Sequence, residues 1–195
     1  MWRFCSAVLL VAGFWQLGGS AWLLAKAELA QYLIGNAWDR QLDSGEQRKP
    51  WPWADTWPVA KLQLAQQKPL LVLNGTSGQA LAFGPGLLET SALPGERLQD
   101  ARTTVIAAHR DTHFHGVANL QVGDPVRLQA ADGRWYFFRV MQTRVVNSQQ
   151  EKLPVYAERG LTLVTCYPFD AVGAGGPLRY VVQATYEPDT GNVQL

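Results

Sequence analysis

The chain has 195 residues, which is enough for one domain of ordinary size with an appendage but not for two full domains. Its 17 basic and 16 acidic side chains leave a net charge of +1, which excludes a protein built mainly to coat nucleic acid or an anionic membrane surface. With 47% hydrophobic and 17% charged residues the chain is not disordered, and two cysteines exclude a disulfide-rich scaffold and a four-cysteine zinc site.

The apolar excess lies at the start of the chain, where residues 4–25 contain no charged side chain. As a helix these residues would extend about 33 Å, enough for a hydrocarbon core of about 30 Å. We therefore expect a transmembrane signal anchor over residues 1–26, with the rest of the chain outside the cytoplasm. The alternative is a cleaved signal peptide, because Ala25-Lys26-Ala27 has the spacing of a cleavage site. The apolar segment is longer, however, than the roughly 7–15 residues usual for the apolar region of a cleaved signal peptide.

Residues 27–58 predict an amphipathic helix followed by a Trp- and Pro-rich linker. The helix is indicated by apolar residues at approximately helical spacing, namely Leu29, Tyr32, Leu33, Trp38 and Leu42. Prolines and Gly45 then interrupt regular structure, and the linker carries Trp51, Trp53 and Trp57. Because indole rings pack well on apolar surfaces, we expect this segment to dock onto the domain that follows.

From residue 59 onward the pattern is one of short strands with little helix between them. Apolar runs bounded by turn residues predict strands over 59–64, 70–73, 103–108, 126–128, 135–146, 161–165 and 178–186. Asp132-Gly133 indicates a hairpin, and Leu87–Ala92 is too short for more than a turn or two of helix. Residues 59–195 are therefore predicted to form an antiparallel barrel or sandwich of seven or eight strands.

Two clusters of side chains with useful chemistry follow predicted strand ends. All three histidines fall in the segment His109–His115 (HRDTHFH), directly after the strand that ends near residue 108. The second cluster is Thr162–Pro168 (TLVTCYP), in which Pro168 should stop the strand close to Cys166. Strand alternation places Cys166 on the same face as the residues two and four positions before it.

A strand that starts near Arg179 and runs antiparallel to the first would place Arg179 beside Cys166. A thiol, an imidazole and a guanidinium at one place suit covalent acyl transfer, in which Cys166 attacks a carbonyl and His109 exchanges protons. Arg179 would stabilise the oxyanion, because arginine stays charged and offers several donors in a fixed fork. On exposure statistics alone, Cys166 would instead be a small buried apolar residue.

These motifs resemble those of the sortases, the membrane-anchored cysteine transpeptidases of bacterial surfaces. The T-L-x-T-C signature is present at residues 162–166, and the residues that match the family's catalytic histidine and arginine are His109 and Arg179. The segments His109–Phe114 and Cys166–Asp170 look most like the Gram-negative subgroup (class GN, marine proteobacterial). Ala108 departs from the glycine that many members have before the histidine.

The resemblance implies a mostly β fold, a closed eight-stranded sortase-type β-barrel with short helices behind an N-terminal transmembrane helix. It implies that Cys166 attacks an LPxTG-like motif near the C-terminus of a substrate protein, and that an unknown amine acceptor resolves the thioester. His109 would act as general acid and base, and Arg179 would hold the oxyanion. The implied location is the inner (cytoplasmic) membrane, single-pass, with the catalytic domain on the periplasmic side. No cofactor is implied, and the substrate groove is expected to include Thr165, Tyr167 and Phe169.

Two other functions remain open at the level of sequence. On a strand, the alternating residues His109, Asp111, His113 and His115 would share a face and could serve a metal-dependent hydrolase. Against this, a zinc hydrolase usually draws ligands from several segments, and the chain has no second histidine cluster. The other function is that of a non-catalytic tethered β-domain that binds peptides. Taken singly, Asp111 suits a turn or loop cap, and Cys5 has no evident role.

Overall fold

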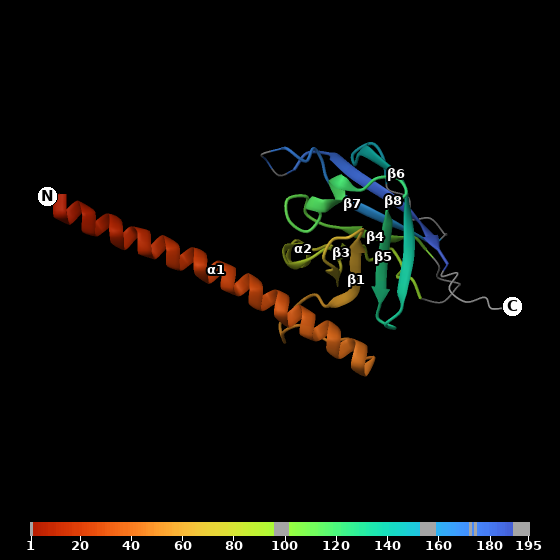
Figure 1. The fold of residues 1–195 in the computed structure, drawn as a ribbon, viewed down its shortest axis with the longest axis horizontal. Coiled ribbons are helices and arrows are strands. Elements are labelled where there is room, and N and C mark those ends of the chain that lie inside the picture. Colours follow the sequence, from red (N-terminus) through yellow and green to blue (C-terminus); the bar gives the residue numbers. More distant parts are fainter. Residues whose placement is uncertain (1, 96–101, 153–158, 172, 174, 189–195) are drawn as a thin grey trace.

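Eight strands close into a barrel whose order around the wall is β1-β2-β3-β4-β7-β8-β6-β5 (Figure 1). The structure is a computed structural model that describes residues 2–95, 102–152, 159–171, 173 and 175–188, without the side chains of residues 3–5, 7–9, 11, 12, 14, 17 and 20. The expected closed barrel of eight strands is confirmed within this part of the chain. The strands are β1 (Pro58–Leu64), β2 (Leu70–Asn74), β3 (Gly86–Leu87), β4 (Thr104–Ala107), β5 (Pro125–Ala130), β6 (Trp135–Asn147), β7 (Gly160–Cys166) and β8 (Leu178–Glu187).

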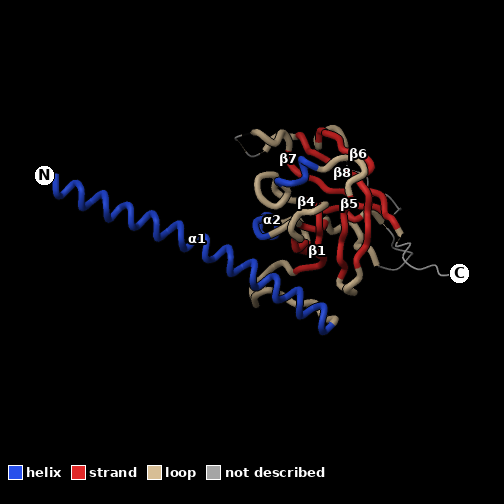
Figure 2. Tube along the Cα trace, viewed as in Figure 1, coloured by secondary structure: helices blue, strands red, loops and turns tan. Residues whose placement is uncertain are grey.

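Three helices accompany the described strands, and Figure 2 shows them in blue against the red barrel. They are α1 (Trp2–Ser44), α2 (Gly78–Phe83) and the 3₁₀ helix η2 (His115–Asn119). Neither short helix was predicted, although Ser77 caps α2 by accepting a hydrogen bond from the Ala80 amide. The sequence left room for no more than a turn or two of helix over Leu87–Ala92, and the structure has the short strand β3 at Gly86 and Leu87, which pair with both β2 and β4.

Successive residues of β7 point alternately into and out of the barrel. Leu161 and Leu163 belong to the main hydrophobic core, and each is 1% exposed. Thr162, Val164 and Cys166 have the opposite parity and lie on the outer face, as the sequence alternation predicts. Cys166 is the last residue of β7 and is half-buried, whereas residues 161–165 are buried. The strand therefore delivers the thiol at the rim of the barrel.

One uninterrupted helix, α1, precedes the barrel, and Figure 1 shows its first half projecting away while its second half lies against the strands. The docked face consists of the buried residues Ala30, Ile34, Ala37, Trp38 and Gln41. Ile34 packs with Leu73 of β2. The predicted amphipathic face holds in part: Trp38 is buried and Leu33 and Leu42 are half-buried, whereas Leu29 and Tyr32 are 56% and 69% exposed. Small residues let the helix approach closely, whereas hydropathy alone favours the larger Leu and Tyr side chains.

Among the residues that the structure describes, no helix combines the length and the apolar character needed to cross a bilayer. The transmembrane anchor predicted over residues 1–26 therefore has no support from the structure, although α1 does make this segment helical. Residue 1, the side chain of Cys5 and residues 189–195 lie outside the described part of the chain.

Two indoles hold the Trp- and Pro-rich segment after α1 against the barrel. Trp51 packs edge-to-face on Phe83 of α2 with ring centroids 5.2 Å apart, and Trp57 packs against the main core. Trp53 is 80% exposed, so the expected docking holds for the two flanking indoles and not for the central one. The segment therefore leads the chain from the end of α1 into β1 along the barrel surface.

Candidate active site

His109 and Cys166 leave the barrel at the same edge because β4 and β7 are parallel neighbours. The two strands pair in register up to Ala107 and Val164. The amide of Ala108 then donates to the Val164 carbonyl at 3.2 Å, which extends the ladder by one residue. Since parallel strands end at the same edge of a sheet, the residue after Ala108 emerges next to the end of β7.

The strand on the other side of β7 supplies Arg179. β8 runs antiparallel to β7, and the pairing partner of Cys166 is Arg179. The amide of Tyr167 donates to the Leu178 carbonyl at 3.1 Å, so the ladder continues one step beyond β7. The predicted proximity of Arg179 and Cys166 is therefore confirmed. With His109, these residues come from three adjacent strands at one end of the barrel.

The three side chains differ in exposure and in their contacts. Cys166 is a free, half-buried thiol, and His109 is exposed. Arg179 is half-buried, and its Nη1 donates to the carbonyls of Gly176 and Leu178 at 2.7 and 2.8 Å. A half-buried thiol at the same barrel edge as an imidazole and a permanent positive charge supplies the groups that nucleophilic acyl transfer requires.

Thr165 joins the cysteine strand to the histidine segment. Its hydroxyl donates to the Ala108 carbonyl at 2.8 Å, and the side chain is 2% exposed. Because a hydroxyl has one hydrogen to donate, this bond leaves none for a substrate. The predicted place of Thr165 in the substrate groove therefore has no support from this geometry. The side chain instead fixes the residue that precedes His109.

Tyr167 and Phe169 form an aromatic cluster with Tyr180 of β8. The ring centroids lie 5.9 Å apart for Tyr167 and Phe169, 6.3 Å for Tyr167 and Tyr180, and 5.1 Å for Phe169 and Tyr180. Tyr180 in turn packs against the main core. The cluster therefore anchors the start of the loop after Cys166. Both loop rings are half-buried and retain exposed apolar surface near the thiol, and their predicted role in substrate binding stays a prediction.

The histidine segment does not assemble the ligands of a metal. In the described part of the chain, which includes His109, Asp111, His113 and His115, no three ligand side chains gather closely enough to hold an ion. The metal-dependent hydrolase hypothesis assumed a strand, but residues 110–114 form turns and η2 begins at His115. The shared face on which that hypothesis depended is therefore absent. Asp111 instead pairs with Arg110.

Sequence reasoning missed Arg110, whose side chain is enclosed between the histidine segment and the loop after Cys166. The residue is 4% exposed. Its guanidinium donates to Asp111 and to the backbone carbonyls of Pro168, Ala171 and Gly173. An arginine directly after the histidine was visible in the sequence. Its three carbonyl partners lie about sixty positions away in the chain, however, and nothing local indicates them.

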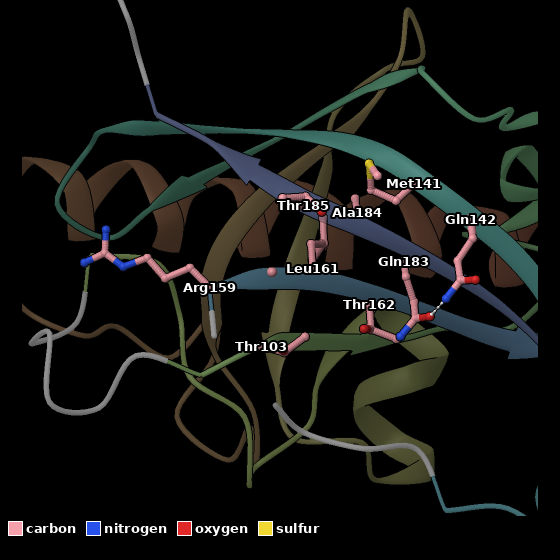
Figure 3. Close-up of a pocket in the computed structure, with 10 residues that line it drawn as sticks. Thr103, Met141, Gln142, Arg159, Leu161, Thr162, Gln183, Ala184 and Thr185 are labelled. Atoms are coloured by element: carbon pink, nitrogen blue, oxygen red, sulfur yellow. Dashed lines mark hydrogen bonds between the residues drawn. The ribbon is translucent and has the colours of Figure 1, made fainter. Parts of the chain in front are cut away.

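A polar groove of about 290 Å³ opens on the outer face of the barrel over β7 and β8 (Figure 3). Thr162 and Gln183 are paired across these strands, on the face that carries Cys166, and Gln142 donates to the side-chain oxygen of Gln183. The hydroxyl of Thr162 is buried, and no described residue hydrogen bonds to it. Four residues of extended strand, about 13 Å, separate Thr162 from Cys166. The polar lining includes Thr103, Gln142, Arg159, Thr162, Gln183 and Thr185.

The barrel is similar to a known family of protein domains. A family model described as a sortase domain matches residues 63–187, more than half of the chain. The chain belongs to the sortase family. The matched range runs from within β1 to the end of β8, so the sortase domain includes His109, Cys166 and Arg179. Membership confirms the resemblance at the level of the family and supports a sortase-type function for the barrel.

Individual sortases match over part of their length. Sortase D of Bacillus subtilis (strain 168) is 31% identical over 115 residues, which covers 58% of this chain and 55% of that protein. Sortase A from Corynebacterium diphtheriae superposes with a TM-score of 0.60 at 25% identity, covering 79% of this chain and 72% of its own. A Clostridium perfringens Sortase D5 transpeptidase has a TM-score of 0.56 at 24% identity, covers 67% of this chain and 79% of its own, and shows the shared sortase fold.

The environment of His113 gives the sortase barrel a pH-dependent stability. Burial lowers the pKa of His113 below its ordinary value of 6.5, a hydrogen bond to the Ala82 carbonyl opposes the shift, and the charge of His109 adds to it. The unfolded state therefore binds this proton more tightly than the folded state. The free energy of unfolding should fall as the pH drops from about 6.5 through the folded-state pKa.

His113→Gln should flatten this pH dependence, because it removes the group that resists protonation in the folded state. Urea unfolding at about pH 7.5 and about pH 5.5 measures the difference in unfolding free energy. His115→Gln, which removes an exposed imidazole from the same segment, is the matched control and should keep the wild-type difference. Equal pH dependence in wild type and His113→Gln would contradict the assignment.

Proposed function

We propose that the chain is a cysteine transpeptidase that cleaves a sorting motif near the C-terminus of a substrate protein and transfers the shortened protein to an amine. The observation that carries the proposal is the convergence of Cys166, His109 and Arg179 at the ends of three adjacent strands. Membership of the sortase family supports the same chemistry. The activity requires an accessible sulfur, and Cys166 is half-buried at the rim.

Acyl transfer begins when the sulfur of Cys166 attacks the scissile carbonyl carbon. The thiol proton passes to the imidazole of His109, which delivers a proton to the leaving amine as the C–N bond breaks. The acyl group remains on Cys166 as a thioester. In the second half the incoming amine attacks the thioester carbonyl and gives a proton to His109. The C–S bond then breaks, and the sulfur regains its proton.

Arg179 stabilises the negative charge that develops on the carbonyl oxygen in both halves of the reaction. The two backbone contacts of its guanidinium use Nη1, whereas arginine carries five N–H donors in all. Those contacts hold the guanidinium near the start of β8, where Arg179 is the pairing partner of Cys166, and the remaining donors are the ones proposed to meet the oxyanion. The Thr165 hydroxyl does not donate a hydrogen bond to the oxyanion, because it donates to the Ala108 carbonyl.

The substrate is proposed to carry an LPxTG-like motif and to lie extended along the outer face of β7 and β8. With its scissile carbonyl at Cys166, such a peptide reaches Thr162 and Gln183 about four residues further along. The polar groove there offers amide and hydroxyl groups to that part of the substrate. The motif itself is supported by the resemblance of residues 162–166 to the T-L-x-T-C signature.

We propose that the protein lies in the inner (cytoplasmic) membrane, crosses it once and has its barrel on the periplasmic side. We also propose that it belongs to the Gram-negative subgroup of sortases. The subgroup is supported by the segments His109–Phe114 and Cys166–Asp170. The anchor is supported by the uncharged residues 4–25 and by exposed apolar side chains among the described residues of the first half of α1. There Trp15 and Trp22 are 83% and 65% exposed, and exposed apolar surface of this kind marks a contact site for lipid or protein.

Cys166→Ala should abolish formation of a thioester with an LPxTG-like peptide, because the nucleophile is removed. Mass spectrometry of the intact protein, incubated with peptide and no added amine, detects the acyl adduct. Cys5→Ala removes the other of the two cysteines and should form the adduct as wild type does. An adduct on Cys166→Ala would exclude this residue as the nucleophile. Peptide binding without any adduct in wild type would favour the non-catalytic binding domain.

Arg179→Lys should lower kcat by about 10²–10³-fold with little change in KM, because a point charge replaces a planar fork that acts mainly on the transition state. Steady-state kinetics of peptide cleavage measure the loss. Arg134→Lys, in the β5–β6 turn with a side chain 80% exposed, is the matched control and should retain the wild-type rate. A near-normal kcat for Arg179→Lys would remove Arg179 from the oxyanion role.

Deletion of residues 1–26 should release the protein from membranes, because the deleted segment contains the uncharged stretch. Cell fractionation followed by an alkaline carbonate wash distinguishes the two forms. The full chain should stay in the washed membrane pellet, whereas a chain that begins at residue 27 should appear in the supernatant. The full-length Cys166→Ala variant controls for loss of activity and should pellet. Release of the full chain by the wash would contradict the anchor.

A further inference from the structure

Arg110 is a buried cation that belongs to neither the proposed catalytic groups nor the barrel core. Its backbone lies in the turn directly after His109, and the residue is 4% exposed. Burying a charge is costly unless hydrogen bonds and an opposite charge compensate it. The contacts of the guanidinium should therefore explain why the chain keeps arginine at this position.

All three nitrogens of the guanidinium are engaged. Nη1 donates to the carbonyl of Pro168, and Nη2 donates to the carbonyls of Ala171 and Gly173 at 2.8 and 3.2 Å. Nε donates to Oδ1 of Asp111 at 2.7 Å, and Nη2 makes a longer contact of 3.3 Å with Oδ2. One side chain thus gathers three carbonyls of a single loop and one carboxylate.

The three carbonyls belong to the loop that connects Cys166 to Arg179. Pro168 lies two positions after the proposed nucleophile, and Gly173 lies six positions before the proposed oxyanion group. Arg110 itself is covalently joined to His109. The guanidinium therefore links the segment that carries the imidazole to the connection between the thiol and the second arginine. Thr165, which holds Ala108, forms a separate link on the strand side.

Asp111 orients the guanidinium from the solvent side. Its carboxylate is 66% exposed and makes the charge-assisted contacts with Nε and Nη2. The hydrogen bond to Asp111 is the main cause that raises the pKa of Arg110, burial opposes it, and the negative charge of Asp111 acts in the same direction as the hydrogen bond.

We propose that Arg110 is a positioning residue, which clamps the loop after Cys166 to the histidine segment and so sets the sulfur against the imidazole. Asp111 serves the clamp by fixing the plane of the guanidinium. The inference rests on the proposed transpeptidase function for its catalytic consequence, and on the contacts alone for its effect on the loop. Lysine cannot replace the clamp, because one ammonium group does not reproduce a rigid fork that reaches three carbonyls and a carboxylate.

The test compares Arg110→Lys with Arg139→Lys. Arg139 is the matched control, because its guanidinium also bridges a backbone carbonyl, that of Gly123, and a carboxylate, that of Glu187. Glu187 ends β8, whereas Arg179 lies near its start, so the control site is at the opposite end of the barrel. Asp111→Asn keeps an oxygen acceptor but removes the charge, and it provides a milder version of the same change.

Three measurements separate positioning from general stability. Single-turnover thioester formation with an LPxTG-like peptide should fall about 100-fold in Arg110→Lys, the loss expected for a displacement of about 1 Å. The pH dependence of the rate at which iodoacetamide alkylates Cys166 should differ between Arg110→Lys and wild type. Amide hydrogen exchange at Phe169, Asp170 and Ala171 should accelerate. Asp111→Asn should show smaller changes in the same direction, and Arg139→Lys should leave all three at wild-type values.

The outcomes distinguish this inference from the proposed function. Unchanged exchange at Phe169–Ala171 and an unchanged alkylation profile in Arg110→Lys would overturn the clamp, whatever the enzyme does. Equal losses in Arg110→Lys and Arg139→Lys would show a stability effect and also overturn it. If wild type forms no thioester but Arg110→Lys still alters exchange and alkylation, the clamp stands and the transpeptidase proposal fails. If Arg110→Lys unfolds, Asp111→Asn decides by the same readouts.

Discussion

The parallel pairing of β4 with β7 is the interaction on which the rest of the site depends. Because the two strands run in the same direction, their ends deliver His109 and Cys166 to one edge of the barrel. An antiparallel arrangement would have left these residues at opposite ends. Hydrogen bonds from the Ala108 amide to Val164 and from the Thr165 hydroxyl to Ala108 extend the contact between the two strands one residue past their last ladder pair. On the other side of β7, β8 places Arg179 opposite Cys166.

The parts of the site that the sequence predicted correctly have local signals. The alternation of residues 161–166 and the proline after Tyr167 define where β7 ends and which way Cys166 faces, and the strand that starts near Arg179 returns beside it. The parallel neighbour of β7 had no such signal. Thr165 and Ala108 are 57 positions apart, and a pairing of that range depends on the whole barrel rather than on any short stretch.

Two of the wrong or missing predictions share a cause, which is that residue type is a weak guide to burial. The docked face of α1 combines Ile34 and Trp38 with alanines and Gln41, whereas Leu29 and Tyr32 face outward, so hydropathy identified only part of the buried face. From sequence alone, an arginine in a loop is expected to be exposed to solvent. The structure instead encloses Arg110 through hydrogen bonds to three distant carbonyls. The metal hypothesis treated residues 109–115 as a strand, but the chain turns there.

The docking of α1 has a mechanical consequence. Gln31 of α1 donates to the Phe83 carbonyl at 2.7 Å, and the adjacent carbonyl of α2, that of Ala82, meets His113. The helix runs for 43 residues without interruption, about 65 Å, so no joint separates its free portion from its docked portion. Anything that holds the first half of α1 therefore also sets the orientation of the barrel rim that carries Cys166, because the second half of the same helix packs on the barrel.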